Sequence, residues 1–562
     1  MLVKFFLIFR KHLLVILILG FALGVRLVET NSLPSALNWD EVSHGYNAYS
    51  ILKTGQDEWG VPFPIIFRAY GDYKLPVYIY LTTVSEAILG LNELSVRLPS
   101  ILAGTASVLF TYLLVSKLIG NKKIALLAAL LMAVEPWSFF VSRIAVEANL
   151  ALFFIIAGTY FLIDWSFKKN WEILLSILFF GLSVWTYNSA RIFTPIFLFT
   201  LLLIYSREIV SWMGKKRLLF IVTTLLALLL FVPMFYQLIN PTGQARYNWV
   251  QILDEGAISK IITQRNELKL PGILPRLLSN KFTYFTRVFI SNYFAHFSPE
   301  FLFLKGGSHY QFNVQNFGLL YLVNLPFFVI GIVVVTRGFR QKRNQVILAW
   351  LLIGPLASSL TREAPHTLRA LMILPIPMIL SAVGLFALTA VIKKEFWQKL
   401  LLVFYAVVLA ACVENYAGRS LKYAQEYSWA WQYGYREMVS SVKDKYSSYD
   451  KIIITKKYGE PHEFFLFFWP WEPAKYREDS NLTRFQQSDW YWVDKFDKFY
   501  FVNDWQIPKK GEEFVLESKG QVDCRDIRCL IVTGPENFPS GWRKLESIKF
   551  LDGQEAFGIF EN

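Results

Sequence analysis

Two adjacent carboxylates stand near the start of the chain, in the segment Asn38-Trp39-Asp40-Glu41. An ionised carboxylate can take a proton from a hydroxyl group, so it can act as a general base beside a reacting substrate. Such a pair is costly to bury in an apolar environment and useful where it meets a polar substrate. We therefore expect Asp40 and Glu41 to be catalytic, with Asp40 as the base. The alternative is a solvated start of a helix.

A second set of residues is suited to holding a phosphate group. A phosphate group is held by positive charge, and arginine can hold it through two hydrogen bonds at once. The alternative for each cation is a side chain that reaches from the end of a membrane span to water. Histidines could add hydrogen bonds or metal ligands. The candidate substrate-binding residues are Lys74, Arg143, Arg191, His309, Arg362, His366 and Arg369.

A metal ion is a further option. Asp40 and Glu147 could together hold Mg²⁺ or Mn²⁺, because magnesium often takes one or two carboxylates plus substrate oxygens. Alternatively, Glu147 pairs with Arg143, which lies four residues earlier. Of the two, we favour the salt bridge.

The composition indicates that these residues are positioned by a membrane protein. Of the 562 residues, 54% are hydrophobic and 17% aromatic, more apolar surface than one ordinary soluble core buries. The net charge is +14, but the basic residues lie between apolar runs and form no stripe with interleaved aromatics. We therefore expect a membrane environment and no nucleic-acid partner.

Hydropathy predicts eleven membrane spans. They are expected near residues 10–28, 97–117, 123–138, 148–166, 172–188, 192–206, 217–238, 318–337, 346–360, 370–391 and 397–415.

Basic residues mark every second connection between these spans, which predicts that those connections are cytoplasmic. The amino terminus is then cytoplasmic in a multi-pass protein of the plasma membrane. The longer connections, about 29–96 and 239–317, and everything after about 416 are then external. The basic groups are Lys4, Arg10 and Lys11; Lys117, Lys122 and Lys123; Lys168 and Lys169; Lys215, Lys216 and Arg217; Arg337, Arg340, Lys342 and Arg343; and Lys393, Lys394 and Lys399.

From about residue 421 the composition becomes that of a soluble domain. We expect two domains, 1–420 in the membrane and 421–562 as a small extracytoplasmic α/β domain. Cys524 and Cys529 either pair there or remain two free thiols. The predicted elements are a helix at Trp429–Tyr446 and strands at Lys451–Thr455, Lys498–Val502, Cys529–Thr533 and Glu546–Phe550.

The order of motifs in the first 415 residues resembles family-39 glycosyltransferases, which include lipid A aminoarabinose transferases and protein mannosyltransferases. The acidic pair is followed by Lys74-Leu75-Pro76 and by Arg97-Leu98-Pro99-Ser100. The other matching elements are Arg143 with Glu147, the run Gly181 to Tyr187 with Arg191 and Pro195, and the loop Ser358 to Arg369.

This resemblance implies a GT-C fold, in which a polytopic helical body carries an outer cavity covered by the first external loop. It also implies a sugar donor on polyprenyl phosphate. The acceptor is a glycolipid, a cell-wall polymer or a protein. Two residues depart from the family pattern: Leu75 stands where many aminoarabinose transferases have proline, and Glu147 replaces aspartate.

Two other classes of protein compete with a transferase. A secondary transporter would place ionisable residues near the middle of the membrane, on interrupted helices related by internal repeats. Here those residues gather at the outer ends of spans, and the sequence shows no repeat. A membrane scaffold would not need an ordered set of carboxylates and cations. The sequence therefore predicts an inverting glycosyltransferase.

Overall fold

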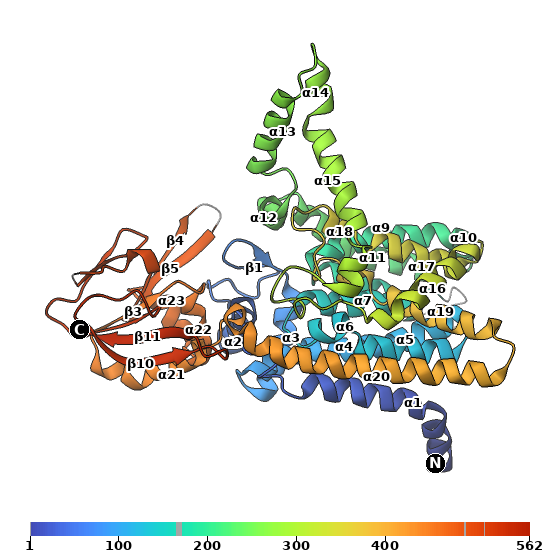
Figure 1. Cartoon of the computed structure of the whole chain (residues 1–562), viewed down its shortest axis with the longest axis horizontal. Helices are drawn as coiled ribbons and strands as arrows, with labels where there is room; N and C mark the ends of the chain where they lie inside the picture. The colour runs from blue at the N-terminus through green and yellow to red at the C-terminus, as the bar shows by residue number, and fades with distance from the viewer. Residues whose placement is uncertain (1, 164–170, 488–489, 511) are drawn as a thin grey trace. The chain divides into compact units, whose positions relative to one another are not determined.

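The computed structural model describes residues 2–163, 171–487, 490–510 and 512–562 (Figure 1). The chain forms two compact units. Unit 1 comprises Met1–Arg26, Ile101–Ser142 and Val146–Ala417, and unit 2 comprises Leu27–Ser100, Arg143–Ala145 and Gly418–Asn562. Unit 2 thus combines the first predicted external loop with the C-terminal segment. The domains 1–420 and 421–562 stay a prediction.

Unit 1 is helical in its described residues. The helices that lie wholly or largely in it are α1 (Leu2–Leu27), α4 (Glu93–Ile119), α5 (Lys122–Val134), α6 (Pro136–Val141), α7 (Glu147–Leu162), α8 (Trp171–Val184), α9 (Asn188–Ile204), α10 (Ser206–Lys215), α11 (Arg217–Leu238), α12 (Pro241–Val250), α13 (Glu255–Glu267), α14 (Leu274–Leu278), α15 (Lys281–Ala295), α16 (Leu325–Arg337), α17 (Lys342–Ile353), α18 (Leu356–Ser359), α19 (Ile376–Val391) and α20 (Glu395–Glu426), with short helical turns at Glu300–Leu304, Leu322–Asn324 and Leu371–Ile373.

Each of the eleven apolar runs forms a helix in its described residues. Residues 164–166 of one run, and the basic pair Lys168 and Lys169, lie outside the described residues. Among the described helices, four are long and apolar enough to cross a membrane, and the bent pair α9 and α10 raises this to as many as five. The number eleven therefore stays a prediction. The four are Glu93–Ile119, Arg217–Leu238, Leu371–Val391 and Glu395–Glu426.

Glycines allow close packing between two helices of unit 1. A Cβ atom on Gly331 of α16 would meet the backbone of Leu380 in α19, and one on Gly384 of α19 would meet the carbonyl group of Phe327. Small residues at such contacts let helix backbones approach in a lipid environment, where packing drives association.

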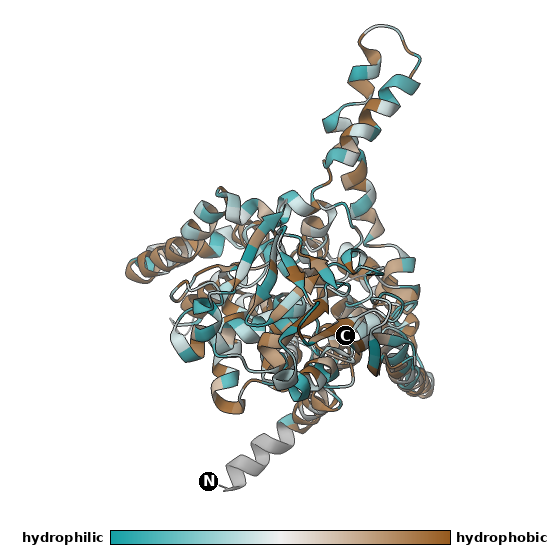
Figure 2. Ribbon diagram, turned by 90° about the vertical axis from the view of Figure 1, so that its left-hand side faces the viewer, coloured by the Kyte–Doolittle hydropathy of each residue, from teal (hydrophilic) through white to brown (hydrophobic). Residues whose placement is uncertain are grey.

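Helices α13 and α15 run side by side away from the other helices of unit 1, with α14 at their tip (Figure 1). Figure 2 shows hydrophilic and hydrophobic residues mixed along them. This arm occupies the long connection 239–317 that the sequence predicts to be external.

Unit 2 begins with α2 (Trp39–Thr54) and α3 (Pro76–Leu89), which pack together. Between them the two-residue strands β1 (Phe67–Arg68) and β2 (Tyr73–Lys74) pair antiparallel, with Phe67 opposite Lys74. This hairpin fixes where Lys74 projects.

The C-terminal part of unit 2 contains a seven-stranded sheet in the order β10-β11-β9-β3-β6-β5-β4. Strand β3 runs parallel to both β6 and β9. Its isoleucines are buried, as expected of a central strand covered on both faces. The sequence predicted β3 and β9 at their observed bounds, and the C-terminal α/β sheet domain is confirmed.

The elements of this part are α21 (Tyr435–Lys445), α22 (Pro461–Phe468), α23 (Pro473–Glu478), β3 (Lys451–Thr455), β4 (Thr483–Gln487), β5 (Trp490–Phe496), β6 (Phe499–Val502), β7 (Glu513–Val515), β8 (Gln521–Asp523), β9 (Cys529–Thr533), β10 (Arg543–Lys549) and β11 (Glu555–Glu561), with short helical turns at Ser428–Trp431, Tyr446–Ser448 and Asp504–Gln506.

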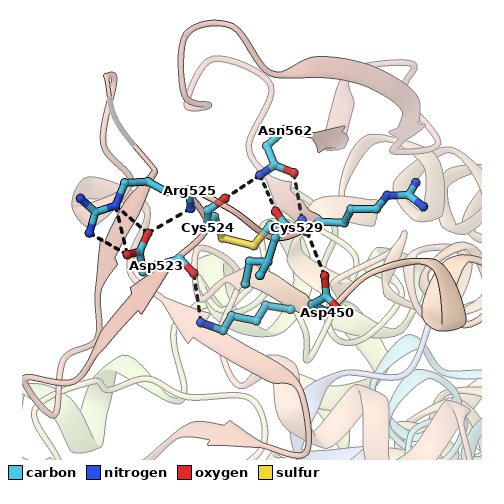
Figure 3. The surroundings of a disulfide bond; sticks show 9 residues. Asp450, Asp523, Cys524, Arg525, Cys529 and Asn562 are labelled. Carbon is cyan, nitrogen blue, oxygen red and sulfur yellow. Dashed lines mark hydrogen bonds and ion pairs between the residues drawn. A yellow bond between two sulfur atoms is a disulfide. The ribbon is translucent and has the colours of Figure 1, made fainter.

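Cys524 and Cys529 form a disulfide beside the end of the chain (Figure 3). The side-chain amide of Asn562 donates to the carbonyl oxygen of Cys524 at 2.8 Å, and its oxygen accepts from the backbone N–H of Cys529 at 2.9 Å. Of the two alternatives left open by the sequence, the structure has the paired one.

Candidate functional site

Helix α2 begins with a capping box that orients the acidic pair. Oδ1 of Asn38 accepts from the backbone N–H of Glu41 at 3.0 Å, and Oε2 of Glu41 accepts from the N–H of Asn38 at 3.2 Å. This reciprocal arrangement satisfies two donors at the helix start. It directs Glu41 inward, whereas the neighbouring Asp40 remains partly exposed.

Glu41 is fully buried and forms a bidentate ion pair with Arg97. Nε of Arg97 lies 2.9 Å from Oε1 of Glu41, and Nη2 lies 3.0 Å from Oε2. The backbone N–H of Ala145 also donates to Oε1 at 2.8 Å. These contacts connect three segments of unit 2 through one carboxylate. The catalytic role that the sequence suggests for Glu41 stays a prediction.

Asp40 pairs with Lys74. Nζ of Lys74 lies 2.7 Å from Oδ1 of Asp40, and the two side chains are 15% and 42% exposed. The nearby ammonium group favours the ionised carboxylate, which is the form a base requires. The structure thus brings together two of the site residues predicted from the sequence.

Arg143 contacts backbone carbonyl groups in the segment before α2. Its Nε donates to Leu33 at 2.9 Å, and its Nη2 donates to Val28 at 2.6 Å and to Glu29 at 2.9 Å. These bonds hold the segment that enters the first loop. Arg143 precedes α7, which begins at Glu147, so the two residues do not share a helix as the favoured salt bridge assumed.

Arg191 lies in the first turn of α9, in unit 1. Its Nε donates to the carbonyl of Val184 at 3.2 Å, and its Nη2 donates to the side-chain oxygen of Gln237. It is buried, so any phosphate that it binds must displace these partners or reach it beside them.

Arg369 and Arg362 lie in the loop that ends with α19. Nη1 of Arg369 donates to Oγ1 of Thr361 at 3.0 Å, and its Nη2 lies 2.9 Å from a carboxylate oxygen of Glu363. Arg362 is more exposed and pairs with Asp254 at 2.8 Å. The two arginines therefore have different partners.

His309 and His366 lie close together, with ring centroids 5.8 Å apart. Nδ1 of His366 accepts from the backbone N–H groups of Leu368 at 3.2 Å and Arg369 at 3.3 Å. Burial, then the charge of Arg369, holds the pKa of His366 well below its usual range. A neutral imidazole whose Nδ1 accepts carries its proton on Nε2, where it can donate to a substrate oxygen.

A residue not predicted to bind substrate from the sequence, Arg246, belongs to this region. Arg246 contributes to the low pKa of His366. It lies on the polar helix α12, within the long connection predicted to be external. A basic residue at that position was the signal in the sequence that could have made Arg246 a candidate for substrate binding. The region joins a carboxylate, two arginines and two histidines.

One group of described residues could hold a metal ion, namely Glu58, His462 and Glu463 in unit 2. A cation shared by Asp40 and Glu147 stays a prediction, because those residues belong to different units.

Comparisons with known proteins agree with the family resemblance. Residues 73–236 match the family model described as dolichyl-phosphate-mannose-protein mannosyltransferase. The protein of Bacillus subtilis (strain 168) named "Putative mannosyltransferase YkcB" is 36% identical over 111 residues, covering 20% of this chain and 15% of that protein. The predicted resemblance to family-39 glycosyltransferases is therefore confirmed within this part of the chain.

Two solved structures are similar to most of the chain at low identity. ArnT of Cupriavidus metallidurans is 11% identical, with 97% of each chain covered and a TM-score of 0.49. The Archaeoglobus fulgidus oligosaccharyltransferase, solved with a tethered acceptor peptide, is 13% identical, with 82% of this chain and 63% of that chain covered and a TM-score of 0.48. At these values neither match carries an argument about this chain.

Proposed function

We propose that this protein transfers a sugar from a polyprenyl-phosphate carrier to a hydroxyl group of an extracytoplasmic acceptor. The observation that carries the proposal is the Lys74–Asp40 pair, partly exposed at the capped start of α2. Lys74 lies inside the segment matched by the mannosyltransferase family model.

In the proposed reaction, Asp40 accepts the proton of the acceptor hydroxyl as its oxygen attacks the anomeric carbon. The bond between that carbon and the phosphate oxygen breaks, and polyprenyl phosphate leaves with the bonding electrons. The configuration at the anomeric carbon inverts. A base that takes the proton during attack and cations that stabilise the leaving phosphate are the two requirements of this step.

The remaining predicted residues have supporting roles in this proposal. Arg369 and the neutral His366 can donate hydrogen bonds to phosphate or sugar oxygens, and Arg191 can do so at the start of α9. Glu41, Arg97 and Arg143 hold the first loop in place through their buried contacts. The proposed acceptor is a glycolipid, a cell-wall polymer or a protein.

The direct test is to incubate purified full-length protein with a panel of polyprenyl-phosphate sugars and candidate acceptors, and to measure release of free polyprenyl phosphate. We expect release with at least one pair, and a product of inverted configuration. Movement of the intact lipid-linked sugar across proteoliposome membranes without release would instead indicate a transporter.

A further inference from the structure

A buried group of three ionisable side chains lies inside unit 2, apart from the residues assigned above. Glu58 lies in the loop after α2, and His462 and Glu463 lie in the first turn of α22. One ligand atom from each lies within 4.8 Å of the other two. The side chains are 2%, 1% and 0% exposed. Segments from opposite ends of the sequence thus place their charges together.

These side chains lack ordinary partners within the described residues. Both ring nitrogens of His462, both carboxylate oxygens of Glu463 and Oε1 of Glu58 have no hydrogen bond. A buried polar group without a hydrogen-bond partner loses the stabilisation that water gave it, and a buried charged group loses more. The fold retains several such atoms at one point, which indicates a missing partner that satisfies them together.

The nearest cation does not supply that partner. Nη2 of Arg484 is 3.6 Å from Oε1 of Glu58, beyond hydrogen-bonding distance, and it donates instead to the backbone oxygen of Glu58 at 2.9 Å. Its guanidinium group lies over the rings of Trp59, at 4.2 Å, and Tyr476, at 5.1 Å. One arginine so occupied does not satisfy the carboxyl groups of both Glu58 and Glu463.

We propose that Glu58, His462 and Glu463 bind a zinc ion. Carboxylate oxygens and imidazole nitrogens are ordinary zinc ligands, and two carboxylates balance the charge of the ion. Three protein ligands leave a tetrahedral position for water.

The orientation of His462 suits this role. Nε2 lies 3.9 Å from Oε1 of Glu463, and Nδ1 lies 3.6 Å from Oε2 of Glu460. Nε2 can therefore face the ion while Nδ1–H faces a second carboxylate, the arrangement in which histidine ligands are commonly held. Zinc bonds of about 2.0–2.2 Å at tetrahedral angles separate ligand atoms by about 3.3–3.6 Å. The pair of Nε2 and Oε1 of Glu463, at 3.9 Å, therefore needs only a small closure, and every ligand atom of the group lies within 4.8 Å of the others.

A bound ion would fasten the first loop to the C-terminal part of unit 2. Helices α2 and α22 already approach closely, since Gly45 of α2 faces the ring of Phe467. Glu58 lies just beyond α2, whose first turn carries Asp40. Zinc would therefore position the loop and would not contact the reacting groups.

The first test measures the metal content of purified full-length protein after incubation with zinc and desalting. We expect about one zinc ion per chain, and a loss of most of it in Glu463→Gln and His462→Ala. The matched control is Glu86→Gln, since Glu86 is also a buried carboxyl without a hydrogen-bond partner but lies outside the group. Zinc-free wild type, or equal zinc in all variants, would overturn the proposal.

A second test needs no variant and therefore does not depend on their folding. We expect a membrane-permeant zinc chelator to lower the melting temperature of the wild-type protein and added zinc to restore it. X-ray absorption at the zinc edge should show nitrogen and oxygen neighbours at about 2.0–2.1 Å, including imidazole. An unchanged melting temperature would instead mean that Glu58 and Glu463 satisfy each other by sharing a proton.

Discussion

Arg97 and Glu41 form a fully buried, two-point ion pair that joins the start of α4 to the first turn of α2. Arg97 also donates to the carbonyl oxygens of Ala36 at 2.6 Å and Pro34 at 3.4 Å. One guanidinium group thus holds both Glu41 and the segment just before the acidic pair. Removing one partner of a buried pair leaves the other charge uncompensated.

Glu41→Gln should therefore destabilise the protein. Removing one partner of a buried ion pair typically lowers the free energy of unfolding by about 3–5 kcal/mol. We expect the lower end of this range, because Arg97 keeps its hydrogen bonds to backbone carbonyl groups in the variant. Thermal melting of the purified protein measures it. A double variant with Arg97→Met should lose less than the sum of the two single changes. Wild-type melting combined with lost activity would instead favour a catalytic Glu41.

Asp40→Asn should abolish sugar transfer and leave melting and donor binding close to wild type. The amide has nearly the shape of the carboxylate but cannot accept the acceptor's proton. General-base catalysis typically contributes about 10²–10⁴-fold, so the loss should be clear in the carrier-release assay.

Two comparisons sharpen this test. Lys74→Met should lower activity less than Asp40→Asn, because it removes the cation and keeps the base. Full activity of Asp40→Asn would remove the base from the mechanism. Equal losses in Asp40→Asn and Glu147→Gln, with recovery in excess Mg²⁺ or Mn²⁺, would support a cation held by these two carboxylates.

The sequence located the acidic pair but could not divide its roles. Asp40 and Glu41 have the same chemistry, and only the register of α2 turns one inward and the other outward. The spacing Asn38-x-x-Glu41 resembles a capping box, which was the available signal for an inward glutamate. Its partner Arg97 could not be identified, because ion pairing across distant segments is set by packing.

The same distinction applies to the C-terminal sheet. Strands β3 and β9 are runs of β-branched and apolar residues, so their sequences predict buried central strands. Strands β4 and β5 mix polar and aromatic residues, and no predicted strand covers them. The group of Glu58, His462 and Glu463 was also missed, since the separation of its members along the chain gives no ligand spacing.

Arg369→Ala should weaken binding of a polyprenyl-phosphate donor about ten- to a hundred-fold, the expected cost of a lost hydrogen bond to a charged phosphate. Titration with a fluorescent donor analogue measures the change in Kd. Arg362→Ala is the comparison, because that second predicted substrate-binding arginine is more exposed and pairs with Asp254; we expect it to weaken donor binding less. Wild-type affinity in both variants would place the phosphate elsewhere.

The C-terminal part of unit 2 should face outward in intact cells. Cys524 and Cys529 are buried, so an introduced thiol is the better probe. In a background with Cys412→Ser, Trp505→Cys should react with a membrane-impermeant maleimide, since Trp505 is 80% exposed. Phe339→Cys, at a residue 56% exposed in a predicted cytoplasmic connection, should react only after permeabilisation. The reverse pattern would invert the topology.

His296 should make unit 1 sensitive to acid. Its Nδ1 lies 2.7 Å from the carbonyl oxygen of Asn292, and its Nε2 lies 2.7 Å from Oγ of Ser358. Burial lowers the pKa of His296 from 6.5 to about 4. The folded state therefore resists a proton that the unfolded state accepts. The stability that the neutral ring contributes is complete above about pH 6.5 and is lost as the pH falls towards 4.

Replacing this ring with a group that does not titrate should reduce the acid sensitivity. His296→Asn keeps a hydrogen-bonding side chain and should lower the melting temperature at pH 7.5, where the native contacts are lost. Between about pH 6.5 and 4, however, its melting temperature should fall less steeply than that of wild type. Lowering the pKa from 6.5 to about 4 corresponds to about 3 kcal/mol. Parallel melting curves across this range would show that His296 does not control the acid response.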